Sequence, residues 1–248
     1  MLLEGLNSHH DLMMILTSIF NLNFNRTCPL LMVLTVNQTE TKSHIMKTKL
    51  FTLIIALAFG GSLWAQTPLS KEEKDFALKY MKESTDYMTS TLKGLSEEQL
   101  KFKPDAKSWS VEDCLRHLMI AEQGIWMGFV EANLSATPNP SNREGLPWSD
   151  EQVIGAITSR DQKATTSAEA EPQNVEGDYK EVLKNFKKLR AEHAKWLKST
   201  DEDLRNRVAQ SPVGKIDLYQ AVLLISGHVR RHTDQMKEVM ASEGFPKQ

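Results

Sequence analysis

Three histidines in this sequence have the residue type and spacing of a metal site. His228 and His232 are four residues apart in a segment of helical periodicity, so both imidazoles project from one helix face and can chelate one divalent ion. His117 lies in the run from Trp109 to Leu118, on the apolar side of a second predicted helix. An imidazole from this second helix would complete a set of three ligands.

A histidine on an apolar helix face is more often a hydrogen-bonded core residue than a ligand. Here, however, two imidazoles from one turn and a third from another helix would all need polar partners inside a bundle, and coordination to a metal satisfies them together. Neutral imidazoles suit zinc, nickel, iron or copper better than magnesium or calcium. We therefore expect a divalent metal ion, with zinc first and nickel or iron as alternatives.

Three protein ligands leave at least one coordination position for water, a thiolate or a substrate oxygen. This pattern favours a metal-dependent hydrolase or transferase acting on a small molecule. In the alternative, His193 or Glu122 closes the site as a fourth ligand, and Glu122 is also a candidate general base. Two non-catalytic interpretations stay open. In the first, the protein is a binding or stress-related bundle, and the metal either stabilises the fold or is the cargo. In the second, the three histidines are hydrogen-bonded core residues that bind no metal.

Four long amphipathic helices are predicted from apolar residues spaced three and four apart, at about 70–93, 111–134, 178–199 and 217–242. Ser96 and Ser149 begin shorter helical stretches. Residues 135–147 are rich in Pro, Asn, Ser and Gly, which predicts a lid or rim, and the unpatterned residues 163–177 predict mobility. No segment alternates long enough to predict a strand. The fold class is therefore all-α, a four-helix bundle with short extra helices and long loops.

Residues 46–65 have the pattern of a secretory signal peptide. A basic start at Met46 is followed by the apolar run 50–59 and by a cleavage position after Ala65. This run is shorter than the roughly 20 residues needed to span a bilayer. We expect export to the periplasm or the medium without stable membrane insertion after cleavage. Residues 1–45 are interpreted as upstream sequence from a misassigned start, and residues 66–248 as one domain.

The charge and cysteine content exclude some classes of function. The chain has 30 basic and 32 acidic residues and a formal net charge of −2, so it has no basic signature and no nucleic-acid partner is expected. Cys28 lies in the upstream segment, and Cys114 stands alone on an apolar helix face. A disulfide is therefore not expected in the domain, and Cys114 is interpreted as a small core residue.

Two arginines and one tryptophan have a possible relation to the site. Arg230 and Arg231 lie between the two ligands of the last helix, so they should point away from the metal, and we interpret them as surface charges. Trp148, at the end of the long loop, is interpreted as a core or rim residue, with a position over the site as the alternative.

Two runs, Trp109 to Leu118 and Gly227 to Met236, resemble the DinB-like superfamily. The resemblance covers nearly all of residues 66–248. It implies an up-down-down-up four-helix bundle, commonly a homodimer, with a divalent metal on one histidine of the second helix and two of the fourth. These positions match His117, His228 and His232.

The resemblance implies chemistry less directly than it implies the fold. The family includes thiol-dependent S-transferases and a mycothiol-dependent isomerase, and most of its members have no assigned reaction. Those thiol cofactors are cytosolic, so the predicted export argues against thiol transfer here. The connection over residues 135–177 is also longer than the minimal family connection, which would reshape access to the metal.

Overall fold

The computed structural model describes residues 67–161, 165–211 and 213–247. The predicted upstream segment 1–45 and signal peptide 46–65 lie outside the described residues. Four long helices make up the bundle: α3 (Lys71–Leu92), α5 (Val111–Ile125), α8 (Tyr179–Ser199) and α9 (Leu218–Met240). No helix in the described part of the chain is long and apolar enough to cross a membrane.

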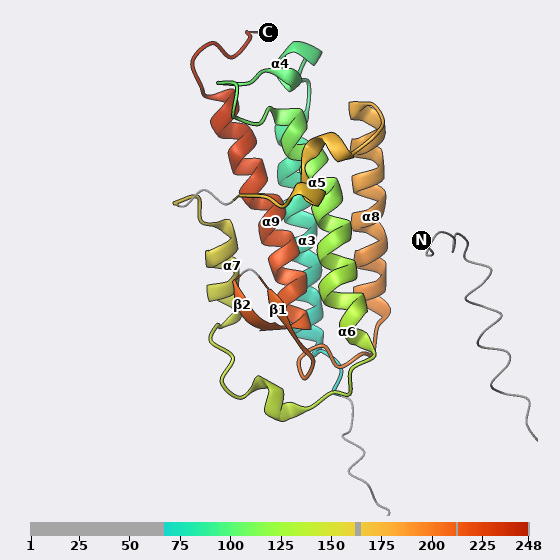
Figure 1. Ribbon diagram of the computed structural model, residues 1–248. Helices are drawn as coiled ribbons and strands as arrows, with labels where there is room; N and C mark the ends of the chain where they lie inside the picture. The colour runs from blue at the N-terminus through green and yellow to red at the C-terminus, as the bar shows by residue number, and fades with distance from the viewer. Residues whose placement is uncertain (1–66, 162–164, 212, 248) are drawn as a thin grey trace, which may run out of the picture. The chain divides into compact units, whose positions relative to one another are not determined.

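The four helices run in the up-down-down-up order (Figure 1). Helix α3 rises, α5 returns, α8 descends again and α9 rises, so the chain between α5 and α8 must travel the length of the bundle. Helices α8 and α9 each pack against both α3 and α5. The prediction of an all-α four-helix bundle is confirmed.

Shorter elements continue or connect the long helices. The predicted helix 111–134 is α5 followed without a break by a π-helical turn, η1 (Trp126–Glu131), and by α6 (Ala132–Leu134). The remaining short helices are α4 (Glu97–Lys101), η2 (Pro140–Arg143), α7 (Asp150–Thr158), η3 (Ala168–Ala170) and η4 (Pro172–Asn174). Serine capping boxes begin α3, α4, α5 and α7, because each serine accepts from a backbone N–H that the first turn leaves unpaired.

The expectation of no strand was wrong. Strands β1 (Val208–Ser211) and β2 (Gly214–Asp217) form an antiparallel hairpin in which Ala209 pairs with Ile216. Each strand has only four residues, too few for an alternating pattern to stand out from the surrounding sequence. Gly214 has a φ of 111°, which a residue with a side chain rarely adopts.

The hairpin end of the bundle is held together by one arginine. The Arg205 guanidinium donates to Glu73 at 2.7 Å, to Asp150 at 2.7 and 2.9 Å and to Asp217 at 3.0 Å. It also lies 4.0 Å from the centre of the Tyr219 ring. The three carboxylates occupy the N-terminal ends of α3, α7 and α9, where negative charge is favoured. Arg205 therefore fixes the starts of three helices relative to one another.

Two clusters of buried apolar side chains fill the bundle. The first joins the N-terminal half of α9 to the hairpin, α7, η1 and parts of α3 and α8. The second joins the C-terminal half of α9 to α4 and to other parts of α3, α5 and α8. Between these clusters along the helices lies a buried polar layer, with at least one residue from each of the four long helices. Its members are Ser84, Glu122, Arg190, His193 and Ser226.

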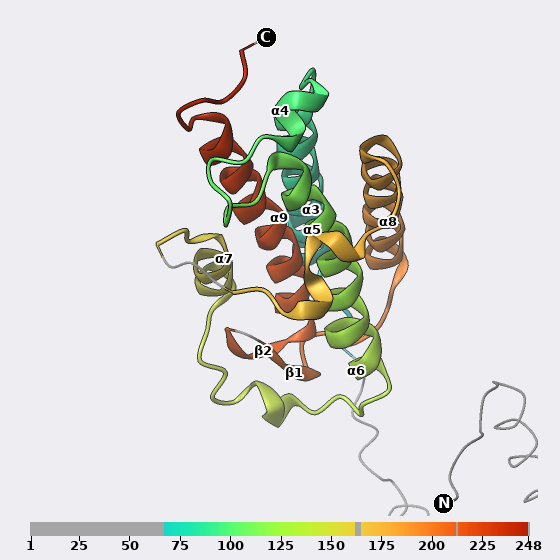
Figure 2. The ribbon, with the colours of Figure 1, turned by 45° about the horizontal axis from the view of Figure 1, so that its top comes forward.

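Helix α7 packs against α9 outside the four-helix core (Figure 2). Gly227 of α9 makes this close approach possible. A Cβ atom at Gly227 would lie 2.4 Å from Cγ2 of Ile157, well inside van der Waals contact. Because Ile157 is β-branched, this methyl group has little freedom to move away. The contact is one residue before His228, so it also fixes the position of a predicted ligand.

We expect Gly227→Ala to lower the free energy of unfolding by about 1–3 kcal/mol, the usual range for overpacking a fitted contact. Denaturant unfolding would measure it. The matched control is Gly124→Ala in α5, where an added Cβ meets nothing within 4 Å. This substitution should raise the free energy of unfolding by up to about 1 kcal/mol, because alanine favours the helix over glycine. In an Ile157→Ala background the penalty of Gly227→Ala should nearly vanish; an equal penalty in both backgrounds would rule out this contact as its cause.

Candidate metal centre

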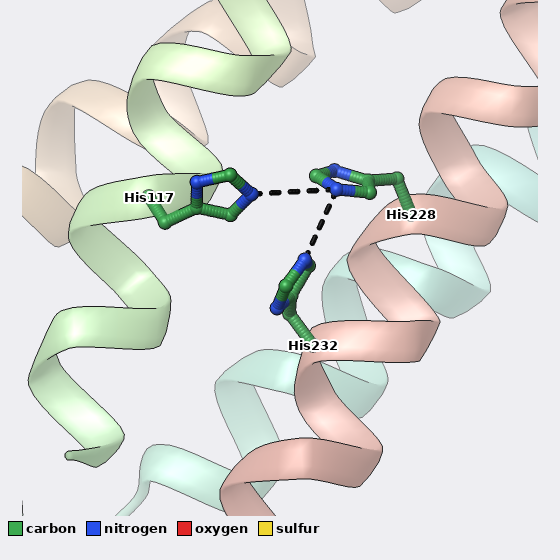
Figure 3. A group of neighbouring side chains, drawn as sticks. All are labelled: His117, His228 and His232. Atoms are coloured by element: carbon green, nitrogen blue, oxygen red, sulfur yellow. Dashed lines mark hydrogen bonds between the residues drawn. The ribbon is translucent and has the colours of Figure 1, made fainter. Parts of the chain in front are cut away.

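The structure brings the three predicted ligands together between α5 and α9 (Figure 3). The Nε2 atom of His228 lies 3.4 Å from Nε2 of His117 and 3.0 Å from Nε2 of His232. Among the described residues these histidines form the one group whose possible ligand atoms converge, all within 4.8 Å of one another. The three Nε2 atoms therefore face a common point.

Hydrogen bonds on the outer side of two rings determine which nitrogen carries the proton. His117 Nδ1 lies 2.8 Å from the carbonyl oxygen of Ala170, which can only accept, so Nδ1 is protonated and Nε2 keeps its lone pair. His232 Nδ1 lies 2.9 Å from Oε1 of Gln235, and donation to this oxygen gives the same tautomer. Both lone pairs are directed at the point where His228 Nε2 also lies.

This donor set fits a divalent metal. Two nitrogens held about 2.0–2.1 Å from a tetrahedral ion are about 3.3 Å apart. The spacings of 3.4 and 3.0 Å are close to that requirement, and all the possible ligand atoms lie within 4.8 Å of one another. A ligating histidine normally donates its other N–H to a carbonyl or carboxylate, as His117 does to Ala170.

The surroundings keep the three imidazoles neutral. Burial, together with the smaller effects of the neighbouring His117 and Arg231, lowers the pKa of His228 to about 3. Burial likewise lowers the pKa of His232 well below its usual value, and it lowers the pKa of His117 although the Ala170 carbonyl and Glu171 act in the opposite direction. Neutral rings are the form that coordinates a metal.

One face of the centre is covered by an indole ring. The Trp109 ring centre lies 4.8 Å from that of His117 and 5.8 Å from that of His232. His117 and His232 are buried, whereas His228 is partly exposed to solvent. Trp109 therefore forms an apolar wall on one side of the centre.

The two candidates for a fourth ligand lie in the polar layer instead. Glu122 accepts from Arg190 at 3.2 Å through both oxygens and from His193 Nδ1 at 2.9 Å. The His193 ring also stacks on Trp126, with ring centres 3.8 Å apart. Neither Glu122 nor His193 belongs to the converging group. The general-base role of Glu122 stays a prediction, although its carboxylate is already engaged by two partners.

Other sequence-based interpretations had mixed outcomes. Arg231 is buried, so its interpretation as a surface charge was wrong, whereas Arg230 is only half-buried and lies over the Tyr87 ring. Trp148 packs against the first apolar cluster. Cys114 is a buried core residue, as predicted, and burial raises the pKa of its thiol.

Sequence reasoning missed the partners that orient the ligands. Gln235 was within reach of such reasoning, because it lies three residues after His232 on the same helix face. The Ala170 carbonyl gave no signal, since a backbone acceptor has no characteristic residue type. Ala170 is also 53 positions from His117, so no local spacing links them.

Comparison with known proteins identifies the family. Residues 80–236 match the sequence model of the DinB superfamily, a span that includes all three histidines. The chain belongs to the DinB superfamily. Within this family the up-down-down-up bundle and the histidines of α5 and α9 agree with what the sequence resemblance implied.

Two similar proteins come from Bacillus subtilis. The chain is 26% identical over 153 residues to the "Uncharacterized protein YuaE" of strain 168. The aligned region covers 60% of this chain and 87% of that protein. A solved structure described as "YfiT from Bacillus subtilis is a probable metal-dependent hydrolase with an unusual four-helix bundle topology" is 17% identical, with a TM-score of 0.46. That similarity covers 69% of this chain and 88% of YfiT.

We expect about one divalent metal ion per chain in untagged protein and none in the His228→Ala/His232→Ala double variant, because one imidazole cannot hold the ion. Inductively coupled plasma mass spectrometry would measure both. The matched control is His193→Ala, which should keep its metal because His193 lies outside the converging group. Loss of metal from a folded His193→Ala protein would instead support His193 as a fourth ligand.

Proposed function

We propose that this DinB superfamily protein is a divalent-metal-dependent enzyme, hydrolytic or transferring, that acts on a small molecule. The observation that carries the proposal is the convergence of three neutral imidazole nitrogens without a fourth protein ligand among the described residues. Three histidines with an open position are typical of catalytic zinc sites, whereas structural zinc sites have four protein ligands. Zinc is the favoured ion, with nickel and iron as alternatives.

In this proposal His117, His228 and His232 hold the ion at the junction of α5 and α9. When bound, the ion supplies Lewis acidity to polarise a substrate oxygen and to make water more acidic. Ala170 and Gln235 fix the orientation of two ligand rings, so little reorganisation is needed during the reaction. Trp109 excludes water from one side and offers a flat apolar surface to the substrate.

The proposal includes the place of action. The basic and apolar pattern of residues 46–65 supports export to the periplasm or the medium, with cleavage after Ala65. Mass spectrometry of the N-terminus of the exported protein would test it. A homodimer, which the family resemblance implies, is proposed on that basis alone.

The open position predicts a spectroscopic result. In cobalt-substituted protein, azide should change the visible absorption reversibly, because it binds where no protein ligand stands. We also expect hydrolysis of 4-nitrophenyl acetate that is lost on chelation and falls at least about 100-fold in the His228→Ala variant. A cobalt spectrum insensitive to azide would contradict the catalytic proposal and favour a closed, non-catalytic site.

The ligands join two helices, so the ion should also stabilise the fold. Metal bound at about 100 times its Kd adds about 2.7 kcal/mol to the free energy of unfolding. For a domain of this size we expect complete chelation to lower Tm by about 5–10 °C. The His228→Ala/His232→Ala variant, measured with and without chelator, is the control and should not change. An unchanged Tm in the parent would contradict a role of the ion in holding α5 against α9.

A further inference from the structure

The chain between α7 and α8 crosses the bundle beside the metal centre (Figures 1 and 2). We call residues 168–177 the crossover segment; it contains η3 and η4, both of which contact α5. The sequence predicted a mobile stretch over residues 163–177, but its described part forms two short helices held against α5. This segment supplies the Ala170 carbonyl that orients His117. The position of that carbonyl therefore depends on what holds the crossover segment.

Arg116, the residue before His117, ties the crossover segment to α5. Its Nη1 atom donates to the carbonyl of Val175 at 2.7 Å, and its Nη2 atom donates to the carbonyl of Gly177 at 2.9 Å. Nε and Nη2 also donate to Glu112, one turn earlier on α5, at 2.9 and 2.6 Å. The side chains of Arg116 and Glu112 are only 18% and 11% exposed, so solvent screens this pair less than a surface ion pair. Glu112 thus fixes the guanidinium, which in turn binds two backbone oxygens of the crossover segment.

Bonds within the crossover segment carry this attachment towards Ala170. The side-chain amide of Asn174 donates to the carbonyls of Ala168 and Glu169 at 2.8 and 3.2 Å. Asn174 ends η4, and the next residue, Val175, is one of the two that the guanidinium holds. Ala170 therefore lies between positions that are bonded on both sides. To turn its carbonyl away from α5, the segment would have to break several of these bonds.

The two side chains of α5 that bond to the segment are consecutive. Successive residues of a helix point about 100° apart, so Arg116 and His117 meet the crossover segment at two separate places. The guanidinium holds its C-terminal end, and the imidazole contacts its middle. A carbonyl fixed at Nδ1 of His117 keeps the proton on that atom and directs the Nε2 lone pair towards His228.

We propose that Arg116 is a positioning residue of the metal centre. It acts through the crossover segment, whose Ala170 carbonyl it holds against Nδ1 of His117. The proposal rests on the proposed metal-dependent function. Without the guanidinium the segment loses two bonds to α5, and the Ala170 carbonyl no longer fixes the tautomer and the orientation of the His117 ring.

Charge and geometry predict opposite effects of removing the guanidinium. Arg116 is a cation, and its loss would leave Glu112 as an unpaired anion, so both changes in charge would tighten the binding of a divalent cation. Loss of the outer partner of a ligand instead weakens metal binding, typically by about 10–100-fold. The sign of the change in metal affinity therefore separates positioning from a purely electrostatic effect.

The first test uses metal-free protein and nitrogen NMR of the histidine rings. In the parent we expect His117 as the Nδ1–H tautomer, because its partner is a carbonyl. In Arg116→Met, which keeps an apolar stem, His117 should become a mixture of tautomers, whereas His232 keeps its bond to Gln235 and its tautomer. An unchanged His117 tautomer in folded Arg116→Met would overturn the proposal.

The conservative variant Arg116→Lys gives a second test of the same contact. An ammonium is a point charge without the planar fork of a guanidinium, so it cannot bind Glu112 and both carbonyls in the same way. We expect the tautomer mixture of His117 to lie between those of the parent and Arg116→Met. If Arg116→Met does not fold, a parental tautomer in Arg116→Lys would overturn the proposal.

The zinc affinity is measured by competition with a chromophoric chelator. The Kd for zinc should rise about 10-fold or more in Arg116→Met, as for other outer partners of a ligand. The matched control is Arg160→Met, at the other end of the same connection. Arg160 is 26% exposed and pairs with Glu238 of α9, so its removal changes the charge equally but leaves the crossover clamp intact. Its Kd should match the parent.

Three results for the Kd would contradict the proposal. An unchanged or a lower Kd in Arg116→Met would show that the guanidinium does not position His117. An equal rise in Arg116→Met and Arg160→Met would assign the loss to a general loosening of the connection.

The two proposals fail in different ways. A parent protein that binds no metal contradicts the proposed function, whatever the tautomer of His117. A parent that binds metal and hydrolyses an ester, with an Arg116→Met variant of parental tautomer and parental Kd, contradicts only the role of Arg116.

Discussion

Three neutral imidazoles whose Nε2 atoms converge on one point cannot all satisfy one another by hydrogen bonds, and this constraint dominates the structure around α5 and α9. The outer hydrogen bonds of His117 and His232 leave acceptors, not donors, on the inner side. His228 can donate to only one of them if it is protonated at Nε2. As a set of hydrogen bonds the three histidines are therefore incomplete. A divalent cation would satisfy all three nitrogens at once.

The bundle separates this centre from a second polar region. In the polar layer, Arg190 donates to Glu122, Thr85, Ser84, Ser226 and the carbonyl of Met81, so its charge is balanced and its donors are used. Such a network specifies how four helices meet but leaves no group free to react. The metal centre differs because its inner nitrogens have no complete set of protein partners. Of the two regions, the incomplete one is therefore where we place the proposed chemistry.

The helix order has a direct consequence for the centre. Because α5 and α8 run in the same direction, the connection between them must return along the bundle, and it passes over the face of α5 that carries His117. The connection therefore acts as part of the site. It provides the carbonyl that orients His117, a contact that the four long helices do not themselves supply.

The sequence by itself determined the four helices and the three candidate ligands, because helical periodicity, serine caps and an i, i+4 histidine pair are local patterns. It did not determine the hairpin of β1 and β2, whose short strands are defined by pairing with each other. Nor did it reveal the carbonyl of Ala170 beside His117, the indole of Trp109 over the rings, or the clamp of Arg205 on three helix starts. These contacts join residues far apart in the chain, so they leave no periodic trace, and only the packing of the helices decided them.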